Sequence, residues 1–377
     1  MRVLLLNTSF RAEGPNNTFR EIAARAREHA VDIWAGALEG RGAMEGLYRS
    51  LGVPTVYFGR PGPGRYTVAG RVQRFIREHG IDLLHSQLLR GEVVGRLALR
   101  SIPGLPYVCT IQNEDPYRIP WKNPLKAALS RWALRKADAV VLVSRNLQDF
   151  VHRYQGIHPG ITTVIPNSID GRLYKTKDSF PPPADFPQDS LIIGTVGRIS
   201  PQKGQRYLID AFHRMVRKFP RARLMIIGSG PLAKRMRKLA ERGSGARRIR
   251  FVGWKSRVDR FLPFFSIYVQ PSLWEGMPFA TLEAMASGVS VIASRVGGLE
   301  ELISDGNDGI LVPPKDVDAL ENAMIRLAED ENYRMRLSRK ARHKIHSDYR
   351  AEIMAREYYQ LYHSLIHHGN RTTNVMD

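Results

Sequence analysis

The sequence predicts two doubly wound α/β domains, each built on a parallel sheet, and three observations support this. Short apolar runs alternate with amphipathic segments along the chain, which is the pattern of βαβ units. The length of 377 residues exceeds what one hydrophobic core usually organises. The alternation stops once, in the polar, proline-rich stretch 168–190, and then restarts. We therefore expect domains at 1–168 and 191–349, joined by a linker at 169–190.

The strand candidates are short apolar runs that end at polar or glycine-containing turns. In the first half they are RVLLLN (2–7), TVYFG (55–59), DLLHS (82–86), YVCTI (107–111), AVVLVS (139–144) and ITTVIP (161–166). In the second half they are LIIGTVG (191–197), ARLMIIG (222–228), RIRFVG (248–253), IYVQPS (267–272), VSVIAS (289–294) and GILVP (309–313).

The chain is strongly basic, with 57 lysines and arginines against 36 aspartates and glutamates and a net charge of +21. Such a charge favours contact with phosphates, anionic lipids or nucleic acid. It is spread almost evenly over the two halves rather than gathered in a tail. Because no recognition module, zinc spacing or aromatic RNA-binding signature accompanies it, a basic nucleic-acid-binding protein is a remote alternative.

Cysteine content and hydropathy indicate the compartment. The single Cys109 lies in the apolar run YVCTI and cannot form an internal disulfide, which fits a reducing environment. The N-terminus has only four consecutive apolar residues, and no later run approaches the roughly 18 apolar residues of a spanning helix. We expect a soluble, cytoplasmic protein.

The first candidate motif follows the strand LIIGTVG. In GRISPQKG (197–204), Arg198 and Lys203 lie on a glycine-flanked turn that leads into a helix. In open α/β sheets, ligands bind beyond the carboxyl ends of the strands. Two cations there, beside a helix N-terminus, suit a diphosphate. An ordinary surface loop capped by Arg and Lys explains the same spacing equally well.

The second candidate motif, GSGPL (228–232), follows the next strand. Gly228 and Gly230 allow a tight turn and close approach of a ligand to the backbone, and Pro231 suits the first turn of a helix. Because the third glycine of the dinucleotide-binding fingerprint is missing, a plain structural turn explains the segment at least as well.

The third candidate motif is LWEGMPFATLEAMASG (273–288), which places Glu275 in a loop and Glu283 inside the following helix. A carboxylate taken out of water needs a partner. Since a carboxylate accepts two hydroxyl hydrogen bonds at once, one glutamate can hold a ribose diol and the other the hydroxyls of a sugar ring. The free N–H groups at the helix N-terminus suit a phosphate or a sugar oxygen.

Together these motifs resemble the retaining glycosyltransferases of family 4 (glycosyl transferases group 1). The shared pattern is G-R-x4-K-G at 197–204, E-x7-E at 275–283 and GGLEELISDGNDGILVPPKD at 297–316. The first-half segments DLLHSQ, AVVLVSRNLQDF and VIPNSID are also similar to that family. The resemblance implies the GT-B fold, in which two Rossmann-like domains face a cleft. It also implies that a final helix, about 350–377, crosses back to complete the domain at 1–168.

The resemblance implies a role for each matching residue. Arg198 and Lys203 would hold the donor's diphosphate. Glu283 would hold the ribose and Glu275 the transferred sugar. Arg198, Lys203 and Glu275 are the expected catalytic residues, since a departing nucleoside diphosphate chiefly needs its developing negative charge stabilised. The expected donor-binding set is Gly197, Arg198, Lys203, Gly228, Gly253, Glu275, Gly276, Met277, Pro278, Phe279 and Glu283.

Two first-domain segments depart from the family pattern. The loop 7–19 keeps only Gly14 where relatives usually have a glycine pair, and Gln112 stands where many relatives have a histidine. Gln112 can hydrogen-bond the donor sugar, and Glu114 or Asp115 can contact an acceptor hydroxyl, although a surface loop also explains them. His85, at a strand end, is either a further candidate or a structural histidine. The acceptor-side candidates are Gly14, His85, Gln112, Asn113 and Glu114.

No metal or cofactor is expected, because the nucleotide-sugar is a substrate. The sequence contains Asp316-Val317-Asp318, a DxD of the kind that holds a divalent cation in glycosyltransferases of another fold. Here it starts D-x-x-A-L, so we expect Asp316 to cap a helix. No histidine and cysteine cluster has zinc spacing.

The predicted function is retaining, metal-independent hexosyl transfer from a UDP- or GDP-sugar to a hydroxyl of a saccharide or lipid-linked glycan, in surface polysaccharide biosynthesis. A sugar-nucleotide epimerase or hydrolase on the same fold is the alternative. The segment WKNPLKAALSRWALRK (121–136) combines tryptophan and leucine with lysine and arginine, which suits a helix lying on an anionic bilayer at the inner face of the cell membrane. A helix packed through its Trp and Leu face into the first domain fits equally well.

Overall fold

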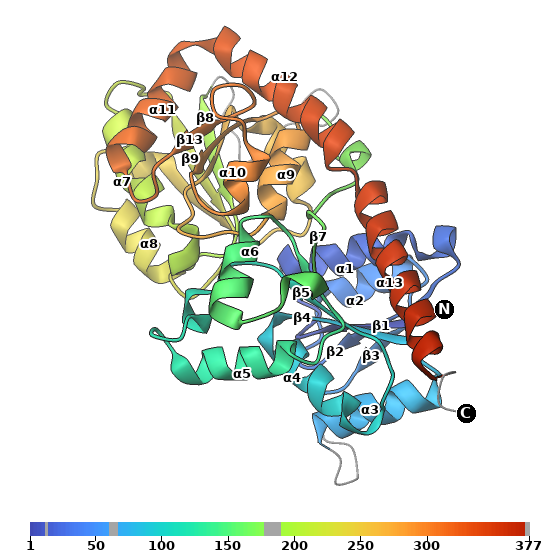
Figure 1. The fold of residues 1–377 in the computed structure, drawn as a ribbon. Coiled ribbons are helices and arrows are strands. Elements are labelled where there is room, and N and C mark those ends of the chain that lie inside the picture. Colours follow the sequence, from blue (N-terminus) through green and yellow to red (C-terminus); the bar gives the residue numbers. More distant parts are fainter. Residues whose placement is uncertain (12–13, 60–66, 177–189, 374–377) are drawn as a thin grey trace. The chain divides into compact units, whose positions relative to one another are not determined.

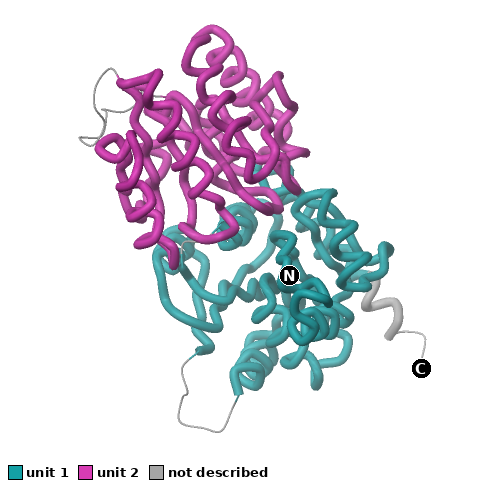
Figure 2. Tube along the Cα trace, turned by 90° about the vertical axis from the view of Figure 1, so that its left-hand side faces the viewer, with its two compact units in different colours: residues 1–168, 351–377 teal, residues 169–350 magenta. Residues whose placement is uncertain are grey.

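The structure, a computed structural model, divides into two compact units (Figure 2). Unit 1 comprises Met1–Ser168 and Ala351–Asp377, and unit 2 comprises Ile169–Arg350. Most of the expected linker, residues 177–189, lies outside the described residues. The structure describes residues 1–11, 14–59, 67–176 and 190–373.

Unit 1 is built on seven parallel strands in the order β3-β2-β1-β4-β5-β6-β7, with helices on the faces of the sheet (Figure 1). The order reverses between β1 and β4, which is the point where doubly wound sheets open to a ligand. The strands are β1 (Arg2–Asn7), β2 (Asp32–Ala37), β3 (Thr55–Tyr57), β4 (Leu83–Gln87), β5 (Tyr107–Ile111), β6 (Ala139–Leu142) and β7 (Thr162–Val164). The α-helices are α1 (Gly14–Ala24), α2 (Ala43–Ser50), α3 (Val68–Glu78), α4 (Leu88–Ala98), α5 (Pro124–Leu134), α6 (Leu147–Asp149) and α13 (Ala351–Thr373).

Unit 2 repeats this architecture with six parallel strands in the order β10-β9-β8-β11-β12-β13. The order reverses between β8 and β11. The strands are β8 (Ile192–Val196), β9 (Arg223–Ile227), β10 (Ile249–Gly253), β11 (Ile267–Gln270), β12 (Ser290–Ser294) and β13 (Ile310–Val312). The helices are α7 (Gln205–Met215), α8 (Ala233–Ala240), α9 (Phe279–Ala286), α10 (Gly298–Leu302), α11 (Val317–Glu329) and α12 (Glu331–Asp348).

The predicted fold class, two α/β units on parallel sheets, is confirmed. Every strand candidate is a strand in the structure, but β2 is absent from the sequence prediction. Its sequence, DIWAGA, has one β-branched residue and ends in alanine and glycine, so it lacks the usual composition of a strand. It is a strand because Val3, Leu4 and Leu5 of β1 pair with it in parallel register.

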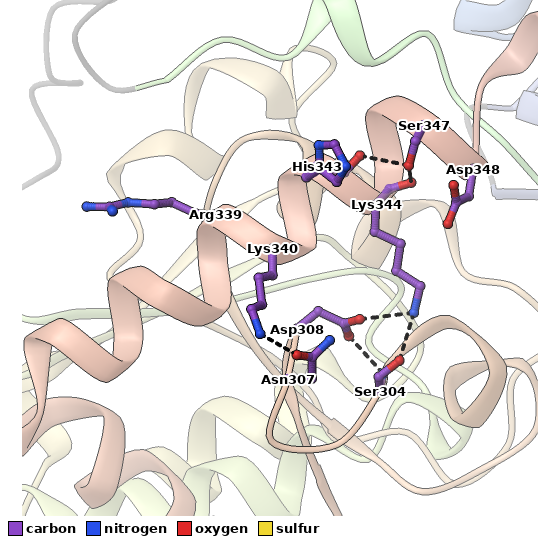
Figure 3. Close-up of a pocket in the computed structure, with 9 residues that line it drawn as sticks. All are labelled: Ser304, Asn307, Asp308, Arg339, Lys340, His343, Lys344, Ser347 and Asp348. Atoms are coloured by element: carbon purple, nitrogen blue, oxygen red, sulfur yellow. Dashed lines mark hydrogen bonds and ion pairs between the residues drawn. The ribbon is translucent and has the colours of Figure 1, made fainter.

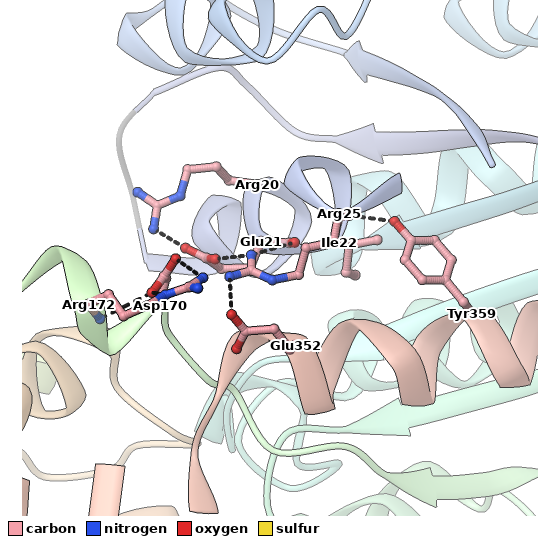
Figure 4. Close-up of polar contacts among 8 residues, drawn as sticks. All are labelled: Arg20, Glu21, Ile22, Arg25, Asp170, Arg172, Glu352 and Tyr359. Carbon is pink, nitrogen blue, oxygen red and sulfur yellow. Dashed lines mark hydrogen bonds and ion pairs between the residues drawn. The ribbon is translucent and has the colours of Figure 1, made fainter. Parts of the chain in front are cut away.

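The last helix, α13, belongs to the core of unit 1 (Figure 4). Its buried tyrosines 358, 359 and 362 share a hydrophobic cluster with strand β1 and helix α1. The Tyr359 hydroxyl donates to the carbonyl of Ile22, 337 positions away in the sequence. The Arg25 guanidinium lies 2.8 Å from a Glu21 carboxylate oxygen and 3.5 Å from that of Glu352. The core of the N-terminal unit therefore depends on the end of the chain.

Candidate functional site

The glycines at the carboxyl ends of three neighbouring strands of unit 2 lie side by side. The Gly197 amide donates to the Ile227 carbonyl at 3.0 Å, and the Gly228 amide donates to the Gly253 carbonyl at 2.8 Å. Gly197, Gly228 and Gly253 thus form a row across the ends of β8, β9 and β10. This carboxyl edge is where open α/β sheets bind ligands.

Two backbone contacts along this edge require glycine. A Cβ on Gly228 would lie 1.9 Å from the Gly197 carbonyl oxygen, and φ there is +140°. A Cβ on Gly297 would lie 2.0 Å from the Glu275 carbonyl oxygen, at φ +48°. No side chain fits either gap, so the loops touch through their backbones and leave their amides close to the site.

Arg198 and Lys203 come from the single loop between β8 and α7. Arg198 follows the strand end and is exposed, and its carbonyl accepts the Gln205 side-chain amide at 3.0 Å. Lys203 ends a 3₁₀ turn, Pro201–Lys203, and its Nζ lies 2.6 Å from Glu275 Oε1. One short loop therefore supplies both predicted cations, and one of them holds a predicted carboxylate.

Glu275 is buried, and protein groups supply its partners. Its Oε1 accepts Lys203 Nζ, the Ser272 hydroxyl at 2.7 Å and Gln270 Nε2 at 3.1 Å, whereas Oε2 accepts Gln202 Nε2 at 3.3 Å. A buried carboxylate persists only with this kind of compensation. Three of these four bonds go to Oε1, so Oε2 keeps more acceptor capacity for a ligand hydroxyl.

Glu283 lies on α9, half-buried, and accepts the Tyr174 hydroxyl at 3.0 Å. Burial raises the pKa of the Tyr268 phenol, and the negative charges of Glu275 and Glu283 raise it further. Both predicted carboxylates therefore influence the same buried tyrosine.

The predicted residues between the two glutamates form the approach to α9. Gly276, Met277, Pro278 and Phe279 are all buried. The Met277 and Phe279 side chains are in the core. These two residues can therefore contact a donor only through their backbone N–H groups at the start of the helix.

On the corresponding edge of unit 1, Gln112 is the hub of a buried amide network. Its Nε2 donates to Thr18 Oγ1 at 3.0 Å and to Gln87 Oε1 at 2.9 Å, and its Oε1 accepts Asn167 Nδ2 at 3.2 Å. Gln87 in turn donates to Asn7 Oδ1 at 2.7 Å. Thr18 of α1, Gln87 of β4 and Asn167 after β7 therefore supply partners for both ends of the Gln112 amide, and its contact with the donor sugar stays a prediction.

The expectation for His85 is corrected. The ring is fully buried, with Nδ1 2.5 Å from the Tyr362 hydroxyl and Nε2 2.7 Å from the Thr110 hydroxyl. Burial lowers the pKa of His85 from 6.5 to about 3. The acceptor-side role is wrong here, because the ring has no exposed atom, and the structural interpretation holds.

Burial of His85 predicts a pH dependence of stability. The unfolded histidine binds a proton below pH 6.5, whereas the folded one does so only near pH 3. The contribution to stability is therefore complete above pH 6.5 and is lost as the pH falls through that window. Unfolding by urea should show wild type losing about 2 kcal/mol more than His85→Gln between pH 7 and pH 5. An exposed control, His363→Gln, should follow wild type, and parallel curves for wild type and His85→Gln would contradict the prediction.

The remaining acceptor-side candidates lie at the same edge of unit 1. Gly14 begins α1, and a Cβ there meets nothing within 4 Å, while Asn113 and Glu114 are half-buried in the loop after β5. Sequence reasoning overlooked Asn7 and Thr8 at the end of β1. Asn7 Nδ2 and Thr8 Oγ1 are buried with no hydrogen-bond partner among the described residues. Their position at the carboxyl end of the first strand is the sequence signal that could have identified them.

Comparisons with known proteins show the family to which the chain belongs. The family model for Glycosyltransferase Family 4 matches residues 16–172, and that for glycosyl transferases group 1 matches residues 176–344. Alpha-maltose-1-phosphate synthase of Mycolicibacterium smegmatis is 30% identical over 273 residues, which are 66% of this chain and 68% of the relative. The chain belongs to the family 4 glycosyltransferases.

Two further likenesses support the fold and class of this glycosyltransferase. The UDP-Gal:alpha-D-GlcNAc-diphosphoundecaprenol alpha-1,3-galactosyltransferase of Escherichia coli is 24% identical over 282 residues, 72% of each chain. The crystal structure of Anabaena Alr3699/HepE in complex with UDP-glucose is 22% identical, with a TM-score of 0.83 over 97% of this chain and 100% of that one. The fold is therefore GT-B, with two parallel-sheet α/β domains.

The DxD of this glycosyltransferase is a helix cap, as expected. Asp316 Oδ1 accepts the Ala319 amide at 2.9 Å and begins α11, while Asp318 pairs with Arg214. In the part of the chain that the structure describes, no three His, Cys, Asp or Glu residues gather as a metal site would require. Within that same part, no helix combines the length and apolar character needed to cross a membrane.

A surface pocket of about 570 Å³ in unit 2 of the glycosyltransferase contains none of the predicted donor residues (Figure 3). Lys344 Nζ lies 2.6 Å from the Leu302 carbonyl and 3.1 Å from Asp308, and Lys340 Nζ lies 2.6 Å from Asn307 Oδ1. These bonds tie α12 to the loop before β13, so we assign the pocket a structural role. Its lining residues are Ser304, Asn307, Asp308, Arg339, Lys340, His343, Lys344, Ser347 and Asp348.

Proposed function

We propose that this glycosyltransferase moves a hexosyl group from a UDP- or GDP-sugar to a hydroxyl acceptor, with retention of anomeric configuration. The observation that carries the proposal is the buried Glu275 carboxylate, 2.6 Å from Lys203 Nζ at the carboxyl edge of the unit 2 sheet. The pair places a cation for phosphate and an acceptor for sugar hydroxyls at one point. A nucleotide-sugar needs both.

In the proposed reaction, Arg198 and Lys203 stabilise the leaving nucleoside diphosphate. Lys203 gives one N–H to Glu275, and an ammonium group has two more for phosphate oxygens. Arg198 adds a planar fork that binds phosphate through two hydrogen bonds. Because these two cations supply positive charge where negative charge develops, we propose that transfer does not depend on a metal.

The two glutamates divide the recognition of the donor. Glu283 holds the ribose, because a carboxylate can accept both hydroxyls of a diol. Glu275 holds the transferred sugar through Oε2, since Oε1 already carries three bonds. Lys203, bonded to Glu275, then lies near the bond between sugar and phosphate that breaks.

For the acceptor, we propose a saccharide or a lipid-linked glycan in surface polysaccharide biosynthesis. This rests on the relative from Escherichia coli, whose name gives a diphosphoundecaprenol-linked sugar as its acceptor. We propose that the protein works in the cytoplasm at the inner face of the membrane, where such a lipid-linked acceptor would be presented.

Calorimetric titration with UDP, GDP and ADP tests the donor site. We expect UDP or GDP to bind saturably and Arg198→Ala to weaken that binding about tenfold or more, because a hydrogen bond to a charged group contributes about 1.5–3 kcal/mol. Arg217→Ala, an exposed arginine beyond the end of α7, is the matched control and should bind as wild type does. Absence of binding by any nucleotide, or equal binding by Arg198→Ala, would contradict the proposal. Release of free sugar with no transfer to any acceptor would favour a hydrolase.

A further inference from the structure

Helix α5, labelled in Figure 1, has apolar side chains that are exposed to solvent. Leu125 is 80% exposed and Leu129 is 40% exposed, and Ala128 between them is exposed as well. A surface helix normally carries polar residues on its outer side. The inner side of α5 is already filled by Ala127, Ser130, Ala133 and Leu134. The sequence left open whether the leucines face inward or outward, and the structure shows Leu125 and Leu129 facing outward.

The exposed apolar residues extend beyond the helix. Trp121 is 70% exposed, and Tyr117 is also exposed. Lys126 Nζ lies 5.4 Å from the centre of the Tyr117 ring, so Tyr117 is next to α5. Of eight large exposed hydrophobic side chains in the described part of the chain, these two and the two leucines make four. Isolated exposed apolar residues are ordinary, but such a concentration indicates an interaction surface. We call residues 117–136 the α5 surface.

The α5 surface is also basic, and its own segment contains no acidic residue to offset the positive charge. Residues 116–137 contain six lysines and arginines and no aspartate or glutamate. Lys122, Arg135 and Lys136 are exposed, and Lys126 pairs with Asp115 at 2.7 Å, just outside the segment. Apolar and aromatic side chains bordered by cations match the boundary between the acyl chains and headgroups of an anionic bilayer.

The surface is held rigidly by a buried anchor. The Arg118 guanidinium makes two hydrogen bonds with the Glu92 carboxylate, at 3.0 and 3.1 Å, and a third with the Ser130 hydroxyl of α5 at 3.2 Å. The Arg118 carbonyl accepts Gln155 Nε2 at 2.8 Å. The apolar residues are therefore displayed without any need to refold, which lowers the cost of docking.

We propose that the α5 surface docks on an anionic bilayer, with Trp121, Leu125 and Leu129 in the interfacial layer and the flanking cations against lipid phosphates. A second copy of the chain would bury the same side chains, but it would set two basic segments against each other, and their repulsion would oppose the contact. The role in reaching a lipid-linked acceptor rests on the proposed function, whereas docking itself rests on the surface alone.

Co-sedimentation with vesicles of phosphatidylglycerol and phosphatidylcholine tests the docking. At low salt the full chain should pellet, and raising the salt should release it. Leu125→Glu should weaken binding at least about tenfold, because it removes an exposed leucine that the bilayer would bury and adds a charge that anionic lipids repel. The matched control is Leu47→Glu on α2, which makes the same change at a leucine of unit 1 that is 42% exposed. This variant should pellet like wild type.

Three vesicle results would overturn the docking proposal: failure of wild type to pellet, equal pelleting of Leu125→Glu and wild type, or equal binding to pure phosphatidylcholine. A dimer that light scattering detects and Leu125→Glu dissociates, without vesicle binding, would assign the surface to a second copy and also overturn it. Calorimetry with UDP and GDP separates the two proposals. Nucleotide binding without vesicle binding would support the proposed function and contradict membrane docking. Vesicle binding without nucleotide binding would support docking of the α5 surface and contradict the proposed function.

Discussion

Glu275→Gln is expected to lower kcat for sugar transfer by about 10²–10³-fold, the size seen when one charge-stabilising group is removed from a transition state. Glutamine keeps the volume of the side chain but removes the charge that holds Lys203 Nζ at 2.6 Å. The lysine then loses its position beside the leaving diphosphate. Affinity for UDP or GDP alone should fall much less than kcat, because Arg198 still holds the diphosphate and the other lost contacts are made with the reacting sugar.

Glu283→Gln should behave in the opposite way. If Glu283 holds the ribose, its loss should weaken nucleotide binding about tenfold and lower turnover at saturation much less. Glu241→Gln, at an exposed glutamate after α8, is the control for loss of one negative charge in unit 2. Titration calorimetry and initial rates on the same samples separate the two effects. Equal losses of nucleotide affinity in the Glu275 and Glu283 variants would contradict this division of roles.

The fold could be predicted from the sequence because buried parallel strands are nearly continuous apolar runs. AVVL of β6 and RLMII of β9 are of this kind. Strand β2 could not be predicted, because DIWAGA becomes a strand through its pairing with β1 rather than through its own composition. Local propensity predicts an element only where tertiary pairing does not decide it.

The sequence could predict those residues of the candidate site that come directly after a strand. The sequence could not predict the contact between Lys203 and Glu275. These residues are 72 positions apart and meet only because β8 and β11 are neighbours in the sheet. His85 shows the converse. A histidine at a strand end resembles a site residue until Tyr362, 277 positions later, fills the space beside it.

Arg118→Met should produce a large loss of stability in unit 1. The Glu92 carboxylate is fully buried, so burial raises its pKa while the Arg118 guanidinium opposes that rise. Removing the guanidinium leaves an uncompensated buried charge, which costs about 3–5 kcal/mol. Urea unfolding followed by tryptophan fluorescence measures the change. The pair of the exposed Arg49 with the half-buried Glu45 provides the control, because Arg49→Met should cost no more than about 1 kcal/mol.

The double variant Glu92→Met/Arg118→Met distinguishes charge burial from packing. If the cost of Arg118→Met comes from the unpaired carboxylate, removing both charges should recover much of the lost stability, since buried ion pairs can often be replaced by apolar side chains at little cost. The third hydrogen bond, from Arg118 to Ser130, is lost in both variants. A double variant that is stable but binds vesicles weakly would show that this bond positions α5 for docking. A double variant as unstable as the single one would instead mean that the Arg118 side chain stabilises unit 1 through its other contacts rather than by neutralising Glu92.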